Sequence, residues 1–223
     1  MDYSINTCYN LIMNLNLFRF FKKQKLAAFT LHDIVLIVTL IFILLTFAAV
    51  VKGVYMRLNY SLYKGDRFSF QYPNDWTLRE SKGSHEKYFQ VHIFGKIDKA
   101  LGFGPSVALT VYPKKPYGGK FSTLQEMVDQ HLSNAKKLSG YHLESQRVAS
   151  LPAHALAHDV EMSFALRLPL YKTTAKDVPV KQRMLFFEMG SEFFVLNYQN
   201  LSQDYPTSKG VFQRVIRTLR FKS

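Results

Sequence analysis

The sequence predicts an α+β domain, in which helices flank an antiparallel β-sheet and one transmembrane helix comes first. Three observations predict this fold class. Residues 34–51 form an apolar run without a charge, short segments with strand alternation follow one another through tight turns, and two helical segments each carry one apolar stripe. We therefore divide the chain into a basic cytoplasmic tail (1–32), a transmembrane helix (33–55) and one folded domain (56–223).

The apolar run of residues 34–51 has the length of a membrane span. A hydrocarbon core about 30 Å thick needs roughly 20 helical residues, and the run continues with Gly53, Val54 and Tyr55. A buried core helix is one alternative, but it would carry polar residues on some face. A cleaved signal peptide is the other, but its apolar region would be shorter and would precede a small-residue cleavage site. We expect the lipid bilayer to contact the helix along its length, at Ile34, Leu40, Leu45 and Val51.

The orientation of the span does not follow from charge alone. Basic residues are nearly balanced across it: Arg19, Lys22, Lys23 and Lys25 come before, and Lys52, Arg57, Lys64 and Arg67 come after. A long C-terminal domain translocates largely regardless of its charge, whereas a short basic tail stays in the cytoplasm. We therefore expect a single-pass protein of the cytoplasmic (inner) membrane, with its N-terminus inside and its domain periplasmic or extracellular.

Composition limits the chemistry of the domain. Hydrophobic residues make up 48% of the chain and aromatic residues 15%, which excludes disorder. The only cysteine, Cys8, precedes the span, so the domain has no disulfide and no cysteine nucleophile or ligand. A net charge of +13 favours an anionic lipid or an acidic partner, or merely a soluble surface. Nucleic acid is not expected, because the domain is predicted to lie outside and carries no nucleic-acid-binding motif.

Strand alternation recurs along the domain. It predicts strands at residues 60–63, 67–72, 88–97, 106–112, 141–148, 153–166, 182–189 and 192–199. The first two and the last two are expected to form hairpins, which turn at residues 64–66 and 190–191. Trp76, after the first hairpin, is expected in the core. Before the last hairpin we expect a long basic loop that contains Lys172, Lys176 and Lys181.

Two segments show helical periodicity. Residues 122–138 are amphipathic, with a capping box formed by Ser122 and Gln125 or by Thr123 and Glu126. Gly140 is suited to end this helix. Residues 207–219 form the second helix, with an apolar stripe made of Val211, Phe212, Val215, Ile216 and Leu219. Its arginine side chains are expected to face solvent, at Arg214, Arg217 and Arg220.

One segment resembles a known family. Residues 65–76, Gly-Asp-Arg-Phe-Ser-Phe-Gln-Tyr-Pro-Asn-Asp-Trp, are similar to the opening strand of the PsbP-like family, named for the extrinsic PsbP subunit of photosystem II and found also in bacterial envelope proteins. Residues 151–153, the paired strands around Gly190 and the closing helix extend the likeness to about residues 60–221. The resemblance implies an α/β/α sandwich that binds or stabilises a partner at a membrane surface, usually without catalysis. No residue pattern here singles out a role with photosystem II.

Catalytic and metal-binding patterns are sparse. His154 and His158 are four residues apart, which on a strand places both on one face, so they are weak candidates for a metal or anion sensor. The same face carries Leu156 and Val160, which favours two histidines packed among neighbours. A membrane-tethered hydrolase remains a further alternative, although no nucleophile elbow, zinc-protease motif or phosphate-binding loop is present. We expect no enzymatic activity and no cofactor.

The segment from Tyr112 to Lys120 is the best candidate for a contact surface. It combines cations, two prolines and two aromatic side chains, and we expect Lys114, Lys115, Tyr117 and Lys120 to meet a lipid headgroup or an acidic partner. A solvated connection between strands is the alternative. The sequence thus predicts a non-catalytic binding or assembly module, held at the outer face of the membrane, that contacts a protein or envelope partner.

Overall fold

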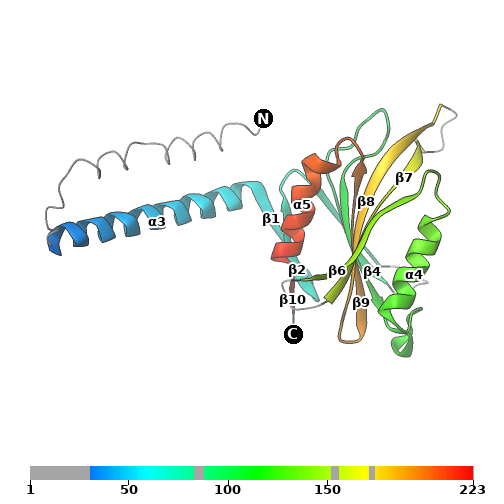
Figure 1. The fold of residues 1–223 in the computed structure, drawn as a ribbon, viewed down its shortest axis with the longest axis horizontal. Coiled ribbons are helices and arrows are strands. Elements are labelled where there is room, and N and C mark those ends of the chain that lie inside the picture. Colours follow the sequence, from blue (N-terminus) through cyan, green and yellow to red (C-terminus); the bar gives the residue numbers. More distant parts are fainter. Residues whose placement is uncertain (1–30, 83–87, 152–155, 171–173, 223) are drawn as a thin grey trace. The chain divides into compact units, whose positions relative to one another are not determined.

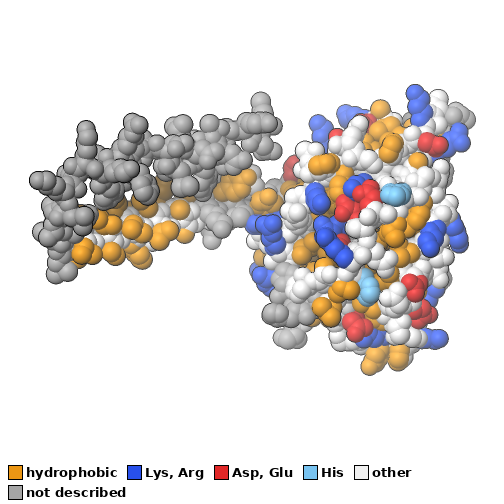
Figure 2. All heavy atoms as spheres, viewed as in Figure 1, with side chains coloured by type: hydrophobic (Ala, Val, Ile, Leu, Met, Phe, Trp, Pro, Cys, Tyr) orange, Lys and Arg blue, Asp and Glu red, His pale blue; other side chains and the backbone are white. Residues whose placement is uncertain are grey.

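Helix α3 (Leu31–Asn59) contains the predicted span. It is the first element in the described part of the computed structural model, which covers residues 31–82, 88–151, 156–170 and 174–222. The segment His32–Tyr55 is long and apolar enough to cross a membrane, with a mean hydropathy of 3.2 and none of it buried. Figure 2 shows hydrophobic side chains along this helix. The hydroxyls of Thr39 and Thr46 donate to helix carbonyls four residues earlier, so neither needs a partner outside the helix.

The chain separates into two units, residues 1–55 and 56–223. The second unit contains two antiparallel sheets (Figure 1). The small sheet has the order β1-β2-β10, with strands β1 (Tyr60–Lys64), β2 (Phe68–Pro73) and β10 (Arg220–Phe221). The large sheet has the order β3-β4-β5-β9-β8-β7-β6, with strands β3 (Thr77–Lys82), β4 (Phe89–Phe94), β5 (Ser106–Pro113), β6 (His142–Ser150), β7 (Leu156–Leu168), β8 (Lys176–Met189) and β9 (Glu192–Leu201).

Two helices cover opposite faces of the large sheet (Figure 1). Because neighbouring side chains of a strand point to opposite faces, Phe186 packs in one core and Phe187 in the other. Helix α4 (Leu124–Ala135) contributes Val128 to the first core. Helix α5 (Tyr205–Thr218) contributes Phe212 to the second core, which the small sheet shares. The predicted fold class is confirmed: helices flank an antiparallel sheet in α/β/α layers.

Several local predictions are confirmed. β1 and β2 pair antiparallel, as do β8 and β9, and the turn at Gly190 has a φ of 58°. Helix α4 is capped at Thr123, the second of the two predicted caps, but the returning Glu126 bond reaches the backbone N–H of Ser122 instead of that of Thr123. Thr123 Oγ1 accepts from the Glu126 backbone N–H at 3.1 Å, and the Glu126 carboxylate accepts from the Ser122 N–H at 2.8 Å. Trp76 packs against the core next to α5.

Three predictions about elements are wrong or incomplete. The loop that was expected to contain Lys172, Lys176 and Lys181 is mostly strand, because Lys176 and Lys181 lie in β8. Lys172 is outside the described residues. Strands β3 and β10 were not predicted. Arg214 does not face solvent: its guanidinium lies 4.6 Å from the Tyr60 ring centroid and donates to Gln71 Oε1 at 2.5 Å. This arginine joins α5 to the small sheet.

Candidate functional site

Residues 113–121, here the basic loop, join β5 to α4 and include the short helix η1 (Lys115–Tyr117). The Lys115 N–H donates to Phe121 O at 2.7 Å, and the Lys114 N–H donates to Ser191 O at 3.0 Å. Gly119 lies so close to the loop's start that a Cβ there would be 1.6 Å from Pro113 O. These contacts give the basic loop one fixed shape.

The four candidate contact residues divide into two groups. Lys114 Nζ lies 3.3 Å from Glu188 Oε2 and 5.3 Å from the Phe193 ring centroid, and its side chain is only 22% exposed. The Lys114 ammonium group therefore pairs within the domain, with Glu188 and the Phe193 ring. Lys115, Tyr117 and Lys120 are exposed, and Tyr117 is 65% exposed despite its large apolar ring. The surface that can meet a partner therefore consists of two cations around one aromatic side chain.

His131 of α4 supports the basic loop from behind. Its ring packs against Phe121, Tyr112 and Phe186, with centroid separations of 6.3, 6.5 and 5.1 Å. Its Nδ1 lies 2.8 Å from Met127 O. Burial lowers the pKa of His131, and the nearby Lys120 charge lowers it further, against the opposing effect of the Met127 carbonyl. His131 is therefore a neutral packing residue beneath the loop.

The two histidine candidates for metal binding are placed differently. His158 lies on the α4 face of β7 with Val160 and Met162, and it is partly buried. Asp159, the carboxylate next to it in sequence, points to the α5 face. His154 lies outside the described residues. Among the residues that the structure describes, no group of three His, Cys, Asp or Glu side chains is arranged to hold a metal ion.

Six alternating charges, here the charged ladder, cross β6, β7 and β8 on the α5 face: Glu144, Arg147, Asp159, Glu161, Lys181 and Arg183. Asp159 is 1% exposed. Its carboxylate accepts from Arg147 Nε at 2.9 Å and from Arg183 Nε and Nη2, both at 2.8 Å. Burial raises the pKa of Asp159, but the two arginines outweigh burial and leave it below its usual value.

The other half of the charged ladder is centred on Lys181. Its ammonium group lies 3.3 Å from Glu161 Oε1 and also pairs with Glu144. Burial lowers the pKa of Lys181, but the two carboxylates outweigh it and raise the value. The same ammonium lies 5.3 Å from the Tyr205 ring centroid, and Arg183 lies 5.5 Å from that of Phe212. The charged ladder therefore binds the edge of the sheet to α5.

The sequence carries a signal for this ladder in the spacing of its charges. Asp159 and Glu161 are two residues apart, as are Lys181 and Arg183, so each pair lies on one strand face. Glu161 lies opposite Arg183 in the pairing of β7 with β8. Opposite charges at this spacing on two predicted strands indicate that the strands are neighbours.

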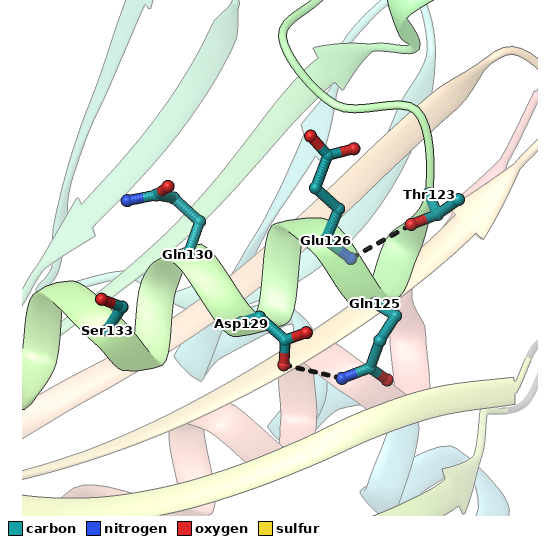
Figure 3. A pocket seen from close by; sticks show the side chains of 6 residues that line it. All are labelled: Thr123, Gln125, Glu126, Asp129, Gln130 and Ser133. Atoms are coloured by element: carbon teal, nitrogen blue, oxygen red, sulfur yellow. Dashed lines mark hydrogen bonds between the residues drawn. The ribbon is translucent and has the colours of Figure 1, made fainter.

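The hollows on the described surface include an open one of about 570 Å³ on the polar side of α4, lined by Thr123, Gln125, Glu126, Asp129, Gln130 and Ser133 (Figure 3). Its Gln125 and Asp129 side chains bond to each other at 2.8 Å. Another, of about 290 Å³, lies where the 95–105 loop meets the start of α5, and includes Lys96, Asp98 and Asp204. Neither hollow contains a histidine or cysteine among the described lining residues.

Comparison with known proteins assigns no family to this chain. No family model matches it, and no curated protein matches it. A cyanobacterial PsbP from Synechocystis sp. PCC 6803 aligns at 11% identity with a TM-score of 0.46, covering 74% of this chain and 93% of that one. LpqN, involved in cell envelope biogenesis of Mycobacterium tuberculosis, aligns at 16% identity with a TM-score of 0.44, covering 76% of this chain and 95% of that one. A Pseudomonas aeruginosa protein of unknown function aligns at 13% identity with a TM-score of 0.45, covering 74% of this chain and 99% of that one.

Proposed function

We propose that this chain is a membrane-anchored binding module without catalytic activity, which contacts a protein or envelope partner on the outer face of the cytoplasmic membrane. The observation that carries the proposal is helix α3, whose apolar segment His32–Tyr55 has no buried residue in its membrane-length window. A bilayer removes such a surface from water at a gain of about 25 cal/mol per Å². Anchoring is the simplest use of this helix.

The basic loop is the proposed contact surface. Its shape is set before any partner binds, so binding costs little ordering of the backbone. Lys115 and Lys120 offer two cations, and Tyr117 offers an exposed ring of the kind that often anchors protein interfaces. Lys114 supports the surface from below through Glu188 and Phe193. An anionic or mixed partner surface fits this combination.

The charged ladder argues against acid–base catalysis by Asp159 and Lys181. Asp159 is held ionised by two arginines, and Lys181 is held protonated by two carboxylates. A general acid or base needs a pKa near the working pH, and these contacts move both groups away from it. The resemblance of residues 65–76 to the PsbP-like family implies a binding role, usually without catalysis.

Site-specific photocrosslinking in intact cells tests the contact surface. A photoreactive phenylalanine at Tyr117 is expected to crosslink to a partner of defined mass. The matched control is Val148 on β6, which is 64% exposed where Tyr117 is 65% exposed. Crosslinks at Val148 but not at Tyr117 would place the contact elsewhere. The double variant Lys115→Ala, Lys120→Ala is expected to reduce the Tyr117 crosslink, because it removes both cations and leaves Lys114 in place.

A further inference from the structure

The loop between β4 and β5, residues 95–105 and here the Ile97 loop, presents an apolar side chain between two cations. Ile97 is 51% exposed, and Lys96 and Lys99 on either side of it are exposed. An apolar side chain can enter the boundary between headgroups and acyl chains, while flanking lysines meet lipid phosphates. The pattern suits an anionic bilayer surface.

The Ile97 loop has a fixed shape. Asp98 Oδ1 accepts from the backbone N–H of Ala100 at 2.7 Å and of Leu101 at 3.1 Å. The Asp98 N–H in turn donates to Phe103 O at 2.9 Å, and the rings and methyls of Phe103 and Leu101 pack against the α4 core. These bonds hold the Asp98 carboxylate against the loop backbone, so Lys96 and Lys99 leave the loop tip with a net positive charge of one.

Contacts within the domain place this loop near the point where the domain begins. A Cβ on Gly95 would lie 2.8 Å from the Trp76 ring, so the base of the loop touches Trp76. The Trp76 N–H donates to Pro73 O at 3.1 Å, and Pro73 pairs with Tyr60, the first residue of β1. Tyr60 follows the apolar segment, which ends at Tyr55, by five residues.

The basic loop lies at the other end of β5. This strand runs from Ser106, next to the Ile97 loop, to Pro113, where the basic loop starts. Its eight residues at about 3.3 Å each separate the two loops by roughly 25 Å. The Ile97 loop and the basic loop therefore lie at opposite ends of β5, and of these two loops the Ile97 loop is the one that adjoins the start of the domain.

We propose that the Ile97 loop docks on the anionic surface of the bilayer that holds α3, with Ile97 inserted at the headgroup boundary and Lys96 and Lys99 on lipid phosphates. This inference rests on the proposed anchoring. Docking leaves the basic loop free for its partner. Each lysine at an anionic surface favours docking about fivefold, so losing both is expected to lower the docked-to-undocked ratio roughly 25-fold.

The test uses the full chain in lipid nanodiscs. A Cys8→Ser, Ile97→Cys variant carries a polarity-sensitive fluorophore, in discs of phosphatidylcholine alone or mixed with phosphatidylglycerol. The matched control carries the fluorophore at Tyr117→Cys, an exposed apolar position beside lysines at the opposite end of β5. We expect a blue shift at position 97 in the anionic discs only, reversed by 1 M salt because the Debye length falls to about 3 Å. A blue shift at position 117 and none at position 97 would overturn the proposal.

Charge variants of the labelled protein provide a second readout. Lys96→Ala with Lys99→Ala should abolish the blue shift, whereas Lys115→Ala with Lys120→Ala, an equal loss of charge, should preserve it. Equal loss in both variants would overturn specific docking. A chain that does not co-elute with nanodiscs contradicts anchoring, and the docking inference falls with it. A chain that co-elutes but shows no shift at position 97 contradicts docking alone.

Discussion

Asp159→Asn is expected to destabilise the domain by about 3 kcal/mol. Removing one partner of a buried ion pair costs about 3–5 kcal/mol, because the remaining charge stays buried without compensation. The Arg183 side chain is only 13% exposed, so it bears this cost, whereas Arg147 is 63% exposed and can turn to water. The lower end of the range therefore applies. For a domain of this size, about 3 kcal/mol lowers Tm by about 6–12 °C.

The assay is thermal unfolding of the full chain in detergent micelles, followed by fluorescence of Trp76, the only tryptophan. Glu188→Gln is the matched control. Its carboxylate is 53% exposed and pairs with Lys114 at 3.3 Å, so its loss should cost less than about 1 kcal/mol. Adding Arg183→Met to Asp159→Asn should recover part of the stability, because the uncompensated charge is gone. An Asp159→Asn protein that melts within 2 °C of the wild type would refute this reasoning.

The same variant should change the response to acid. The folded-state pKa of Asp159 lies below its usual value, so the ion pair contributes stability above the unfolded-state pKa of about 4. That stability is lost as pH falls through the lower, folded-state value. The Asn variant should therefore lose less stability than the wild type below about pH 4. An equally steep loss would assign the acid sensitivity to other groups.

Three further predictions follow from the structure of α4, the basic loop and α5. In a denaturant titration, Thr123→Ala should lower the unfolding free energy by about 1 kcal/mol, because the N-cap oxygen is lost. The control Ser122→Ala keeps the backbone N–H that bonds to Glu126 and should change the unfolding free energy little. Gly119→Ala should lower Tm, because its Cβ would overlap Pro113 O. The control Gly210→Ala has open space around its Cβ in α5 and should raise the unfolding free energy by about 0.5–1 kcal/mol. Equal effects of the two variants would contradict the loop geometry. His131→Gln should reduce the decline of Tm between pH 7 and 5. Burial lowers the folded-state pKa of His131, so the wild type loses stability as pH falls below the unfolded-state pKa of about 6.5. An unchanged decline in the variant would exclude His131 as its source.

Elements with local signals could be predicted from the sequence. The hairpin of β1 and β2 turns at a glycine between alternating strands, and the Thr123 cap lies at the start of an apolar stripe. Strand β3 was missed because Thr77–Lys82 is largely polar, as an edge strand can be. Strand β10 was missed because its two residues pair only with β2, far away in the sequence. The first part of β8 resembled a loop because Lys176, Asp177 and Pro179 interrupt its apolar pattern.

The candidate contact surface could be predicted only in part. Lys115, Tyr117 and Lys120 are exposed, but the sequence around Lys114 does not reveal that Glu188 and Phe193 hold its ammonium group. Those partners come from the distant hairpin of β8 and β9, and their approach depends on the order of strands in the sheet. Likewise, Arg214 was expected to face solvent because it lies outside the apolar stripe of α5. The helical pattern does not reveal that the small sheet packs beside α5 and contacts this arginine through Tyr60 and Gln71.

A C-terminal alkaline phosphatase fusion in bacterial cells, assayed in carbonate-washed membranes, tests the central claim most directly. The enzyme is active only outside the cytoplasm, and carbonate removes proteins that are not embedded. We predict active enzyme in the washed membranes, and loss of that membrane-bound activity in a Leu40→Arg, Leu45→Arg variant, because each arginine in the span costs about 2.5–3.5 kcal/mol. Inactive fusion protein in the membranes would contradict the orientation, and active enzyme in the soluble fraction would contradict the anchor.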